Sequence, residues 1–203
     1  GPVCVQCFLR LHTSAAASMT WAKWRLDTGK GYEEAKSEID AADLDFVTRY
    51  ALWQESATPE RTDNQSPGMH AVYEDSVMRF LHIQLWPRME EITDLTLLPT
   101  YAYFRVYRPG AILESHRDRP ACEVSATLLV STNSKESWPL FIEGERIVQE
   151  PGEMAVYRGC EVEHWREPMT GLSNTFHVQL FVHYVDADGP YVMCAGDKDS
   201  PDA

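Results

Sequence analysis

The tripeptide His116-Arg117-Asp118 constrains most strongly what this chain can fold into. Residues i and i+2 of an extended strand point the same way, so His116 and Asp118 can hold one ion together. His164 follows 46 residues after Asp118 and supplies a second imidazole. Two imidazoles and one carboxylate on one face of a ferrous ion leave the other face open for a co-substrate and oxygen. The spacing therefore predicts a metal site formed by His116, Asp118 and His164.

Composition limits the classes of protein that this chain can belong to. Its 203 residues, 44% of them apolar, are enough for one well-packed domain. A net charge of −13 argues against a general affinity for nucleic acid or for an anionic membrane. No apolar stretch reaches the roughly 18 residues that span a bilayer, so we expect a soluble protein. The five cysteines form no disulfide framework, which favours a cytoplasmic setting.

The first 18 residues differ in character from the rest of the chain. They contain Cys4 and Cys7, a pair with no second Cys/His pair at zinc-site spacing, and Met19 follows as a plausible start. We therefore expect 1–18 to be a disordered or foreign extension and 19–203 to form one domain. The expected parts of this domain are a helical support, a β core and a C-terminal tail, at 32–92, 99–186 and 187–203.

Apolar residues at three-to-four spacing predict two helices, at 32–56 and at 74–92, with Pro87 as a kink or break in the second. Residues 57–72 are rich in Pro, Gly, Asn and Asp, which indicates a loop. After Leu98-Pro99 the pattern changes to short alternating segments. The predicted strands are 101–108, 111–118, 123–131, 139–148, 153–158, 161–166 and 174–185.

Helices followed by a series of short strands predict an α+β domain, mainly β, whose sheet is a closed or sandwiched antiparallel roll. The segment Phe176 to Tyr184 has apolar residues at even positions, whereas His177, Gln179 and His183 stand at odd positions. A polar face on an otherwise buried strand fits a roll with an interior ligand pocket. The alternative is that this face meets solvent, but imidazoles and aromatic rings favour the pocket over a surface of Lys and Glu.

Two segments resemble the core of the Fe(II)/2-oxoglutarate-dependent dioxygenases of the prolyl-4-hydroxylase-like type. The first runs from Tyr103 through Arg108-Pro109-Gly110 to Asp118, and the second from Pro151 to Tyr184. The resemblance implies a double-stranded β-helix (jelly-roll) core supported by N-terminal helices. It also implies Fe(II) held by His116, Asp118 and His164.

The same resemblance implies a reaction. Fe(II), 2-oxoglutarate and O2 would be used to hydroxylate a C–H bond, with release of succinate and carbon dioxide. In related halogenases a small residue replaces the carboxylate ligand and admits a halide. The presence of Asp118 therefore favours hydroxylation.

The co-substrate anchor departs from the family pattern. The family places a Lys or Arg about ten residues after the second histidine, where this chain has Asn174-Thr175. His177, Arg105 and Arg166 are possible replacements, since arginine grips a carboxylate with two parallel hydrogen bonds. Tyr107 matches a tyrosine that often donates to the same carboxylate. We favour Tyr107 with Arg105 or His177.

Two tryptophans are candidates for the mouth of the pocket. Trp138 and Trp165 either contact the substrate or pack in the core, and the sequence favours neither alternative.

Four functions compete. The first is hydroxylation of a small molecule or an amino-acid derivative, and the second is hydroxylation of a protein side chain, such as proline. The third, nucleic-acid demethylation, is disfavoured by the acidic composition. The fourth is a cupin-like metal- or sugar-binding module without oxygenase activity, for which the missing cation at 174–175 is the best support. The sequence does not determine the substrate or the oligomeric state.

Overall fold

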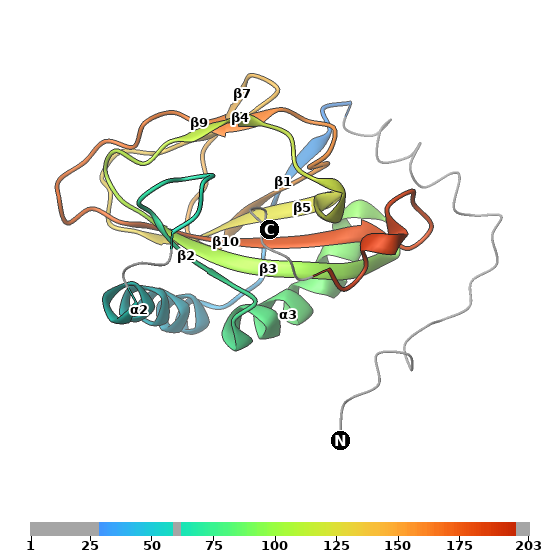
Figure 1. Cartoon of the computed structure of the whole chain (residues 1–203), viewed down its shortest axis with the longest axis horizontal. Coiled ribbons are helices and arrows are strands. Elements are labelled where there is room, and N and C mark those ends of the chain that lie inside the picture. Colours follow the sequence, from blue (N-terminus) through green and yellow to red (C-terminus); the bar gives the residue numbers. More distant parts are fainter. Residues whose placement is uncertain (1–28, 59–61, 198–203) are drawn as a thin grey trace.

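The computed structural model describes residues 29–58 and 62–197 (Figure 1). Two α-helices, two short 3-10 helices and ten strands succeed one another along this part of the chain. In chain order they are β1 (Tyr32–Lys36), α2 (Ala41–Ala57), β2 (His70–Tyr73), α3 (Ser76–Thr93), β3 (Leu97–Tyr107), β4 (Leu113–His116), η2 (Pro120–Cys122), β5 (Val124–Thr132), β6 (Leu140–Ile142), β7 (Glu145–Ile147), β8 (Glu153–Tyr157), β9 (His164–Arg166), β10 (His177–Asp186) and η3 (Val192–Cys194).

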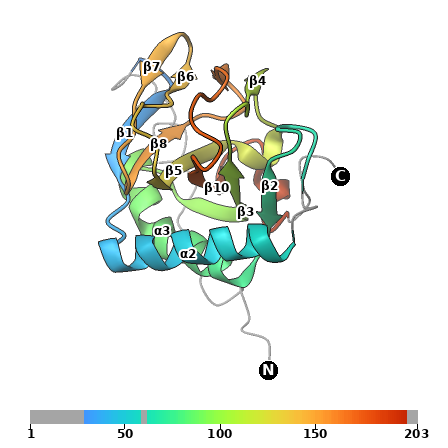
Figure 2. The same ribbon diagram turned by 90° about the vertical axis from the view of Figure 1, so that its left-hand side faces the viewer.

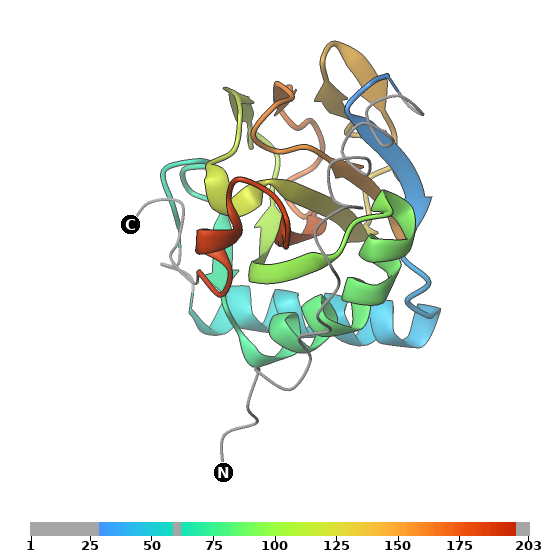
Figure 3. The same ribbon diagram turned by 90° about the vertical axis from the view of Figure 1, so that its right-hand side faces the viewer.

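The strands form two antiparallel sheets that face each other. The major sheet has the order β1-β8-β5-β10-β3-β2, and the minor sheet has the order β4-β9-β6-β7. Figure 3 shows the minor sheet above the major sheet and both α-helices below it. Strands distant in sequence are neighbours in both sheets, as in a jelly roll. The predicted mainly β, jelly-roll fold with N-terminal supporting helices is therefore confirmed.

Both α-helices lie against one face of the major sheet (Figure 2), and the side chains on that face are apolar. Val178, Leu180, Val182 and Tyr184 of β10 are buried in one cluster with side chains of α2 and α3. The alternate residues of the same strand face the minor sheet, because successive side chains of a strand point to opposite faces. The predicted division of β10 into an apolar and a polar face is confirmed.

The predicted helix at 32–56 is wrong in its first part. Tyr32–Lys36 forms β1, an edge strand that pairs with β8 and continues the major sheet. The chain then turns at Glu38, whose φ is 65°. Asp40 caps α2 by accepting hydrogen bonds from the backbone N–H groups of Ala42 and Asp43. The apolar residues of this acidic segment have helical spacing, but a turn and a helix cap interrupt it. Periodicity does not detect these two features.

Other element boundaries also differ from the predicted ones. The predicted loop 57–72 ends in β2, which pairs with β3. The predicted strand 139–148 is a hairpin of β6 and β7, because Glu143 and Gly144 have positive φ and reverse the chain. β4 and β9 are shorter than expected, and Pro87 lies inside α3 without ending it. Residues 1–18, with Cys4 and Cys7, and 198–203 lie outside the described residues.

Within the described ranges, neither α-helix combines the length and the apolar character that crossing a membrane requires. Cys122, Cys160 and Cys194 are free thiols there.

Buried histidines make the stability of this fold sensitive to acid. His82 donates to the carbonyl of His183 at 2.9 Å, and burial lowers the pKa of His82 from 6.5 to about 3. The unfolded chain therefore binds a proton that the folded chain does not bind. The contribution of His82 to the free energy of unfolding, fully present above pH 6.5, is lost as the pH falls below that value. This imidazole should contribute about 1.4 kcal/mol of unfolding free energy per pH unit to that loss.

We expect His82→Gln to reduce the slope of unfolding free energy against pH by that amount between about pH 6 and 4, because glutamine can still donate to the same carbonyl. Urea unfolding at a series of pH values measures the slope. An unchanged slope would show that His82 is not held neutral.

Candidate metal centre

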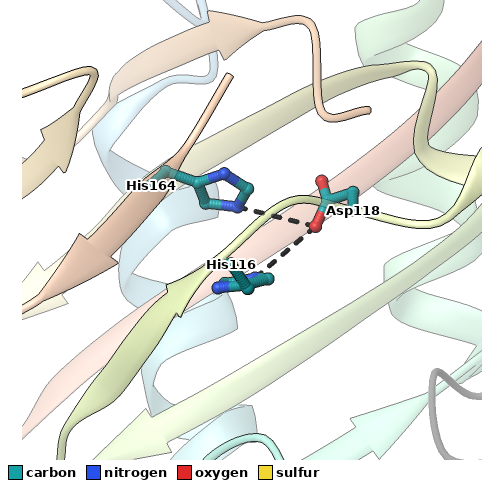
Figure 4. Close-up of side chains that lie close together, drawn as sticks. All are labelled: His116, Asp118 and His164. Carbon is teal, nitrogen blue, oxygen red and sulfur yellow. Dashed lines mark ion pairs between the residues drawn. The ribbon is translucent and has the colours of Figure 1, made fainter. Parts of the chain in front are cut away.

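Three side chains converge where the minor sheet meets the inner face of the major sheet. His116 ends β4, Asp118 follows it in extended chain, and His164 begins β9 directly opposite His116. Figure 4 shows both imidazoles directed at the carboxylate. His164 Nε2 lies 3.5 Å and His116 Nε2 lies 3.6 Å from Asp118 Oδ1. The structure thus brings together the three residues that the sequence singled out.

The orientation of the two imidazoles suits metal binding. Nδ1 of His116 lies 2.8 Å from the Glu114 carbonyl, and Nδ1 of His164 lies 3.2 Å from the Val162 carbonyl. Donation from each Nδ1 puts the lone pair on Nε2, the atom that would bind a metal, as is usual for ligating histidines. Three ligand atoms about 2.1 Å from an ion at right angles lie about 3 Å apart. The donor set and its spacing therefore fit an ion held on one face.

Asp118 supplies the negative charge of this cluster. Burial alone would raise the pKa of its carboxyl, but the adjacent imidazoles of His116 and His164 outweigh burial and hold the pKa well below its ordinary value. Burial also opposes protonation of His116, yet the carboxylate raises the pKa of that imidazole above its ordinary value. Asp118 is therefore an anion at neutral pH, ready to bind a cation.

Further groups hold this carboxylate in place. The Ser125 hydroxyl lies 3.1 Å from Asp118 Oδ2 and 2.9 Å from Nδ1 of His183. The Asp118 N–H donates to the carbonyl of Gly159 at 2.8 Å. A Cβ added at Gly159 would lie only 2.4 Å from Asp118 Oδ2 and 2.3 Å from the Cys122 carbonyl. Only glycine allows the chain before β9 to approach Asp118 this closely.

The three residues line a small cavity between the sheets. Its walls also include Gln65 of the loop before β2 and polar and aromatic side chains from both sheets, among them Tyr103, Thr127, Tyr157, Arg166 and His183. The space open to the centres of water-sized molecules is about 10 Å³, roughly the room of one water.

Proteins of known structure share this arrangement of sheets. A prolyl-4-hydroxylase from Pseudomonas putida superposes with a TM-score of 0.62 at 17% identity, over 81% of this chain and 97% of that one. SnoN, a non-heme alpha-ketoglutarate-dependent epimerase from nogalamycin biosynthesis, gives 0.65 at 11% identity, over 84% of each chain. EctD from S. alaskensis, solved with bound Fe, gives 0.60 at 14% identity, over 86% of this chain and 77% of that one. No family model and no curated protein sequence matches the chain.

The chain has the prolyl-4-hydroxylase-like fold of the Fe(II)/2-oxoglutarate oxygenases.

On this oxygenase fold, Arg105 lies on the inner face of β3 and is fully buried. Its guanidinium forms an ion pair with Asp63, whose side chain is also buried. The same guanidinium donates to Gln65 Oε1 from both terminal nitrogens at 3.1 Å and to the Tyr107 hydroxyl at 3.2 Å. Gln65 Nε2 lies 3.0 Å from His116 Nε2. Arg105 is thus engaged by a carboxylate of the chain itself.

Arg166 is the second buried arginine near the metal centre, and its surroundings are different. It donates to the Trp138 carbonyl at 2.5 Å and to Gln149 Oε1 at 3.2 Å, and it faces the Trp138 ring. Among the described residues, no carboxylate pairs with Arg166, and burial lowers its pKa to about 10. A buried guanidinium without an anion is unusual and indicates a place for one.

The remaining candidates surround Arg166. His177 Nε2 donates to Gln179 Oε1 at 2.9 Å, and burial, with Arg166 nearby, lowers the pKa of His177 to about 3. Tyr107 and His177 both pack edge-on against Trp138. Trp165 points to the other face of β9, where it stacks on Phe141. Neither tryptophan belongs to the cavity wall, and their role in substrate binding stays a prediction.

Sequence reasoning missed Asp63, Gln65, Ser125 and Gly159. Asp63 and Gln65 lie in a stretch that reads as an ordinary polar loop, and no local pattern shows that it inserts beside β3. Gly159 follows a strand as glycines commonly do, so its contact with Asp118 has no signal in one sequence.

Gly159→Ala should weaken metal binding by about tenfold or more, because the methyl group would displace the Asp118 carboxylate. Titration with Mn(II) followed by the change in protein fluorescence measures the affinity. Gly189→Ala is the matched control, since its Cβ would crowd Asp186 and Glu123 rather than a ligand. Equal losses in both variants would show that crowding acts through general destabilisation.

Proposed function

We propose that this protein is an Fe(II)- and 2-oxoglutarate-dependent oxygenase that hydroxylates a C–H bond of a small molecule or an amino-acid derivative, releasing succinate and carbon dioxide. The observation that carries the proposal is the convergence of His116, Asp118 and His164 on one point in a fold shared with 2-oxoglutarate oxygenases. Fold alone would not be sufficient, because one fold can host several functions.

The chain's own residues have defined tasks in this proposal. His116, Asp118 and His164 would hold Fe(II) by two Nε2 atoms and one carboxylate oxygen. When bound, the iron with 2-oxoglutarate and O2 supplies the oxidising chemistry. The Ser125 hydroxyl keeps the Asp118 carboxylate oriented. Asp118 fills the coordination position that a halide would need, which favours hydroxylation.

Arg166 is the residue we propose as the anchor for the far carboxylate of 2-oxoglutarate. It is buried, it has no carboxylate partner among the described residues, and it stands two residues after the ligand His164 on the same strand face. Its guanidinium can form the paired hydrogen bonds that a carboxylate accepts. Tyr107 and His177 lie beside it and can donate single hydrogen bonds. The neutral state of His177 makes it a poor substitute for the cation.

The cavity beside the metal ligands is lined by side chains of both sheets and is small, which supports a small acceptor over a protein side chain. Hydroxylation of a prolyl-type side chain is the second candidate, supported by the structural likeness to a prolyl-4-hydroxylase. A cupin-like binding module is the third, and the buried, unpaired Arg166 disfavours it. The net charge of −13 supports an acceptor other than nucleic acid, and the free thiols support a cytoplasmic location.

The direct test is anaerobic addition of Fe(II) and 2-oxoglutarate, followed by oxygen. We expect the weak visible absorbance of the chelate and then slow succinate release without any acceptor. His116→Ala should abolish both, because it removes a metal ligand. A wild-type protein that produces neither absorbance nor succinate would contradict the proposed function and favour the binding module.

Arg166→Gln should raise the dissociation constant for 2-oxoglutarate by roughly 30-fold, equivalent to about 2 kcal/mol, because a buried charge-assisted pair is lost. Arg146→Gln is the matched control, since Arg146 lies on β7 outside the cavity wall and donates to the Ser137 hydroxyl in an exposed hydrogen bond. Titration of the absorbance with 2-oxoglutarate measures both. An unchanged affinity of Arg166→Gln for 2-oxoglutarate would show that Arg166 does not bind this co-substrate.

A further inference from the structure

A buried ion pair of the chain itself lies behind the cavity wall, next to Gln65. Asp63 pairs with Arg105, and only 4% of the Asp63 side chain and none of the Arg105 side chain is exposed. The Tyr73 hydroxyl donates to the same carboxylate oxygen at 2.8 Å. The pair is therefore closed off from water on the inner face of the major sheet.

Gln65 connects this ion pair to the metal centre. Its Oε1 accepts from both terminal nitrogens of Arg105 at 3.1 Å, while its Nε2 lies 3.0 Å from Nε2 of His116. The lone pair that His116 would give to a metal is thus occupied by an amide of the chain. Binding of a metal requires the Gln65 side chain to turn away. Gln65 therefore covers the metal-facing nitrogen of His116, although the His116 side chain is still 25% exposed.

Two buried guanidiniums near the metal centre differ in their partners: Arg166 lines the cavity, and Arg105 contacts its wall through Gln65. Arg166 has no carboxylate partner among the described residues, whereas Arg105 has Asp63. 2-Oxoglutarate has two carboxylates, of which one is expected on the metal and one on Arg166. Asp63 already neutralises Arg105, so a further anion can bind Arg105 only by replacing Asp63, because a buried arginine without an anion is costly.

We propose that Arg105 recognises a carboxylate of the acceptor substrate, and that Asp63 occupies this position until the substrate displaces it. This inference rests on the proposed function. A substrate without a carboxylate could remove Asp63 only by leaving Arg105 buried and unpaired, so the site selects acids over neutral analogues. The rings of Tyr103, Tyr107 and Phe181 lie within 6 Å of the guanidinium and shield the pair from water.

The geometry also limits the size of the acceptor. A single amide group, that of Gln65, bridges Arg105 and the metal-facing nitrogen of His116. A carboxylate bound to Arg105 would therefore lie only a few bonds from a carbon presented to the iron. Free amino acids and short carboxylic acids meet this condition, whereas a carboxylate at the end of a long chain does not.

The test compares L-amino acids and short aliphatic acids with their own primary amides. Protein loaded with Mn(II) and 2-oxoglutarate is assayed for a rise in Tm, and protein loaded with Fe(II) is assayed for faster succinate release. We expect at least one acid to act at a tenfold lower concentration than its amide. Asp63→Asn should lower the half-saturating concentration of that acid further, because the competing charge is gone.

Arg105→Gln should lose the preference for acid over amide while it still forms the 2-oxoglutarate chelate. Arg108→Gln is the matched control: Arg108 directly follows the last residue of β3, but it pairs with Glu55 of α2 and does not line the cavity. That variant should keep the preference. Its loss in both variants would attribute the effect to general destabilisation and overturn the inference.

Two further results would overturn the inference and leave the proposed function standing. One is that no acid acts better than its amide in the wild type or in Asp63→Asn. The other is that Arg105→Gln loses the chelate absorbance, which would make Arg105 the anchor of 2-oxoglutarate. Absence of that absorbance in the wild type would contradict the proposed function itself, and the inference with it.

Discussion

The buried negative charge of Asp118 is the feature on which the arrangement of the two sheets depends. An ionised carboxylate is stable away from water only when cations or hydrogen-bond donors surround it. Here the partners come from both sheets: His116 and His164 from the minor sheet and Ser125 from the major sheet. The carboxylate therefore joins the sheets by polar contacts where a jelly roll could otherwise be filled by apolar side chains.

A polar interior on this scale is possible because the other face of the major sheet supplies the stability. The apolar side chains of β10, β3 and β5 pack with α2 and α3 in one continuous buried cluster. Burial of that surface is the main favourable contribution to folding. The inner face therefore does not have to supply the apolar core, and it can carry arginines, histidines and glutamines. This division explains why the helices, which contribute no ligand, are needed for the site.

The sequence was sufficient for features that depend on local periodicity. The alternation in β10 correctly separated the helix-facing side chains from the pocket side, and the spacing of His116 and Asp118 correctly placed both on one side of extended chain. Features that depend on distant partners were missed. Tyr32–Lys36 has helical spacing but becomes a strand because β8 offers an edge to pair with. Gly159 and Asp63 matter only through residues far away in the chain.

The position of the co-substrate anchor is another feature that the sequence pattern alone does not locate. The family pattern points to Asn174-Thr175, but those residues precede the start of β10 and lie in a turn, where Thr175 N–H donates to the Leu172 carbonyl. In our proposal the positive charge is supplied instead by Arg166 of β9.

A hydrogen-bonded path joins the two regions. Gln149 accepts from Arg166 and from Gln179, and Gln179 contacts His177. The strand that carries the anchor in the family therefore still takes part, through neutral groups that orient the cation. A site of this kind is defined by the charge required at a point in space, and any strand that reaches the point can provide it. For this reason the two buried arginines are distinguished by their partners in the fold and not by their positions in the sequence.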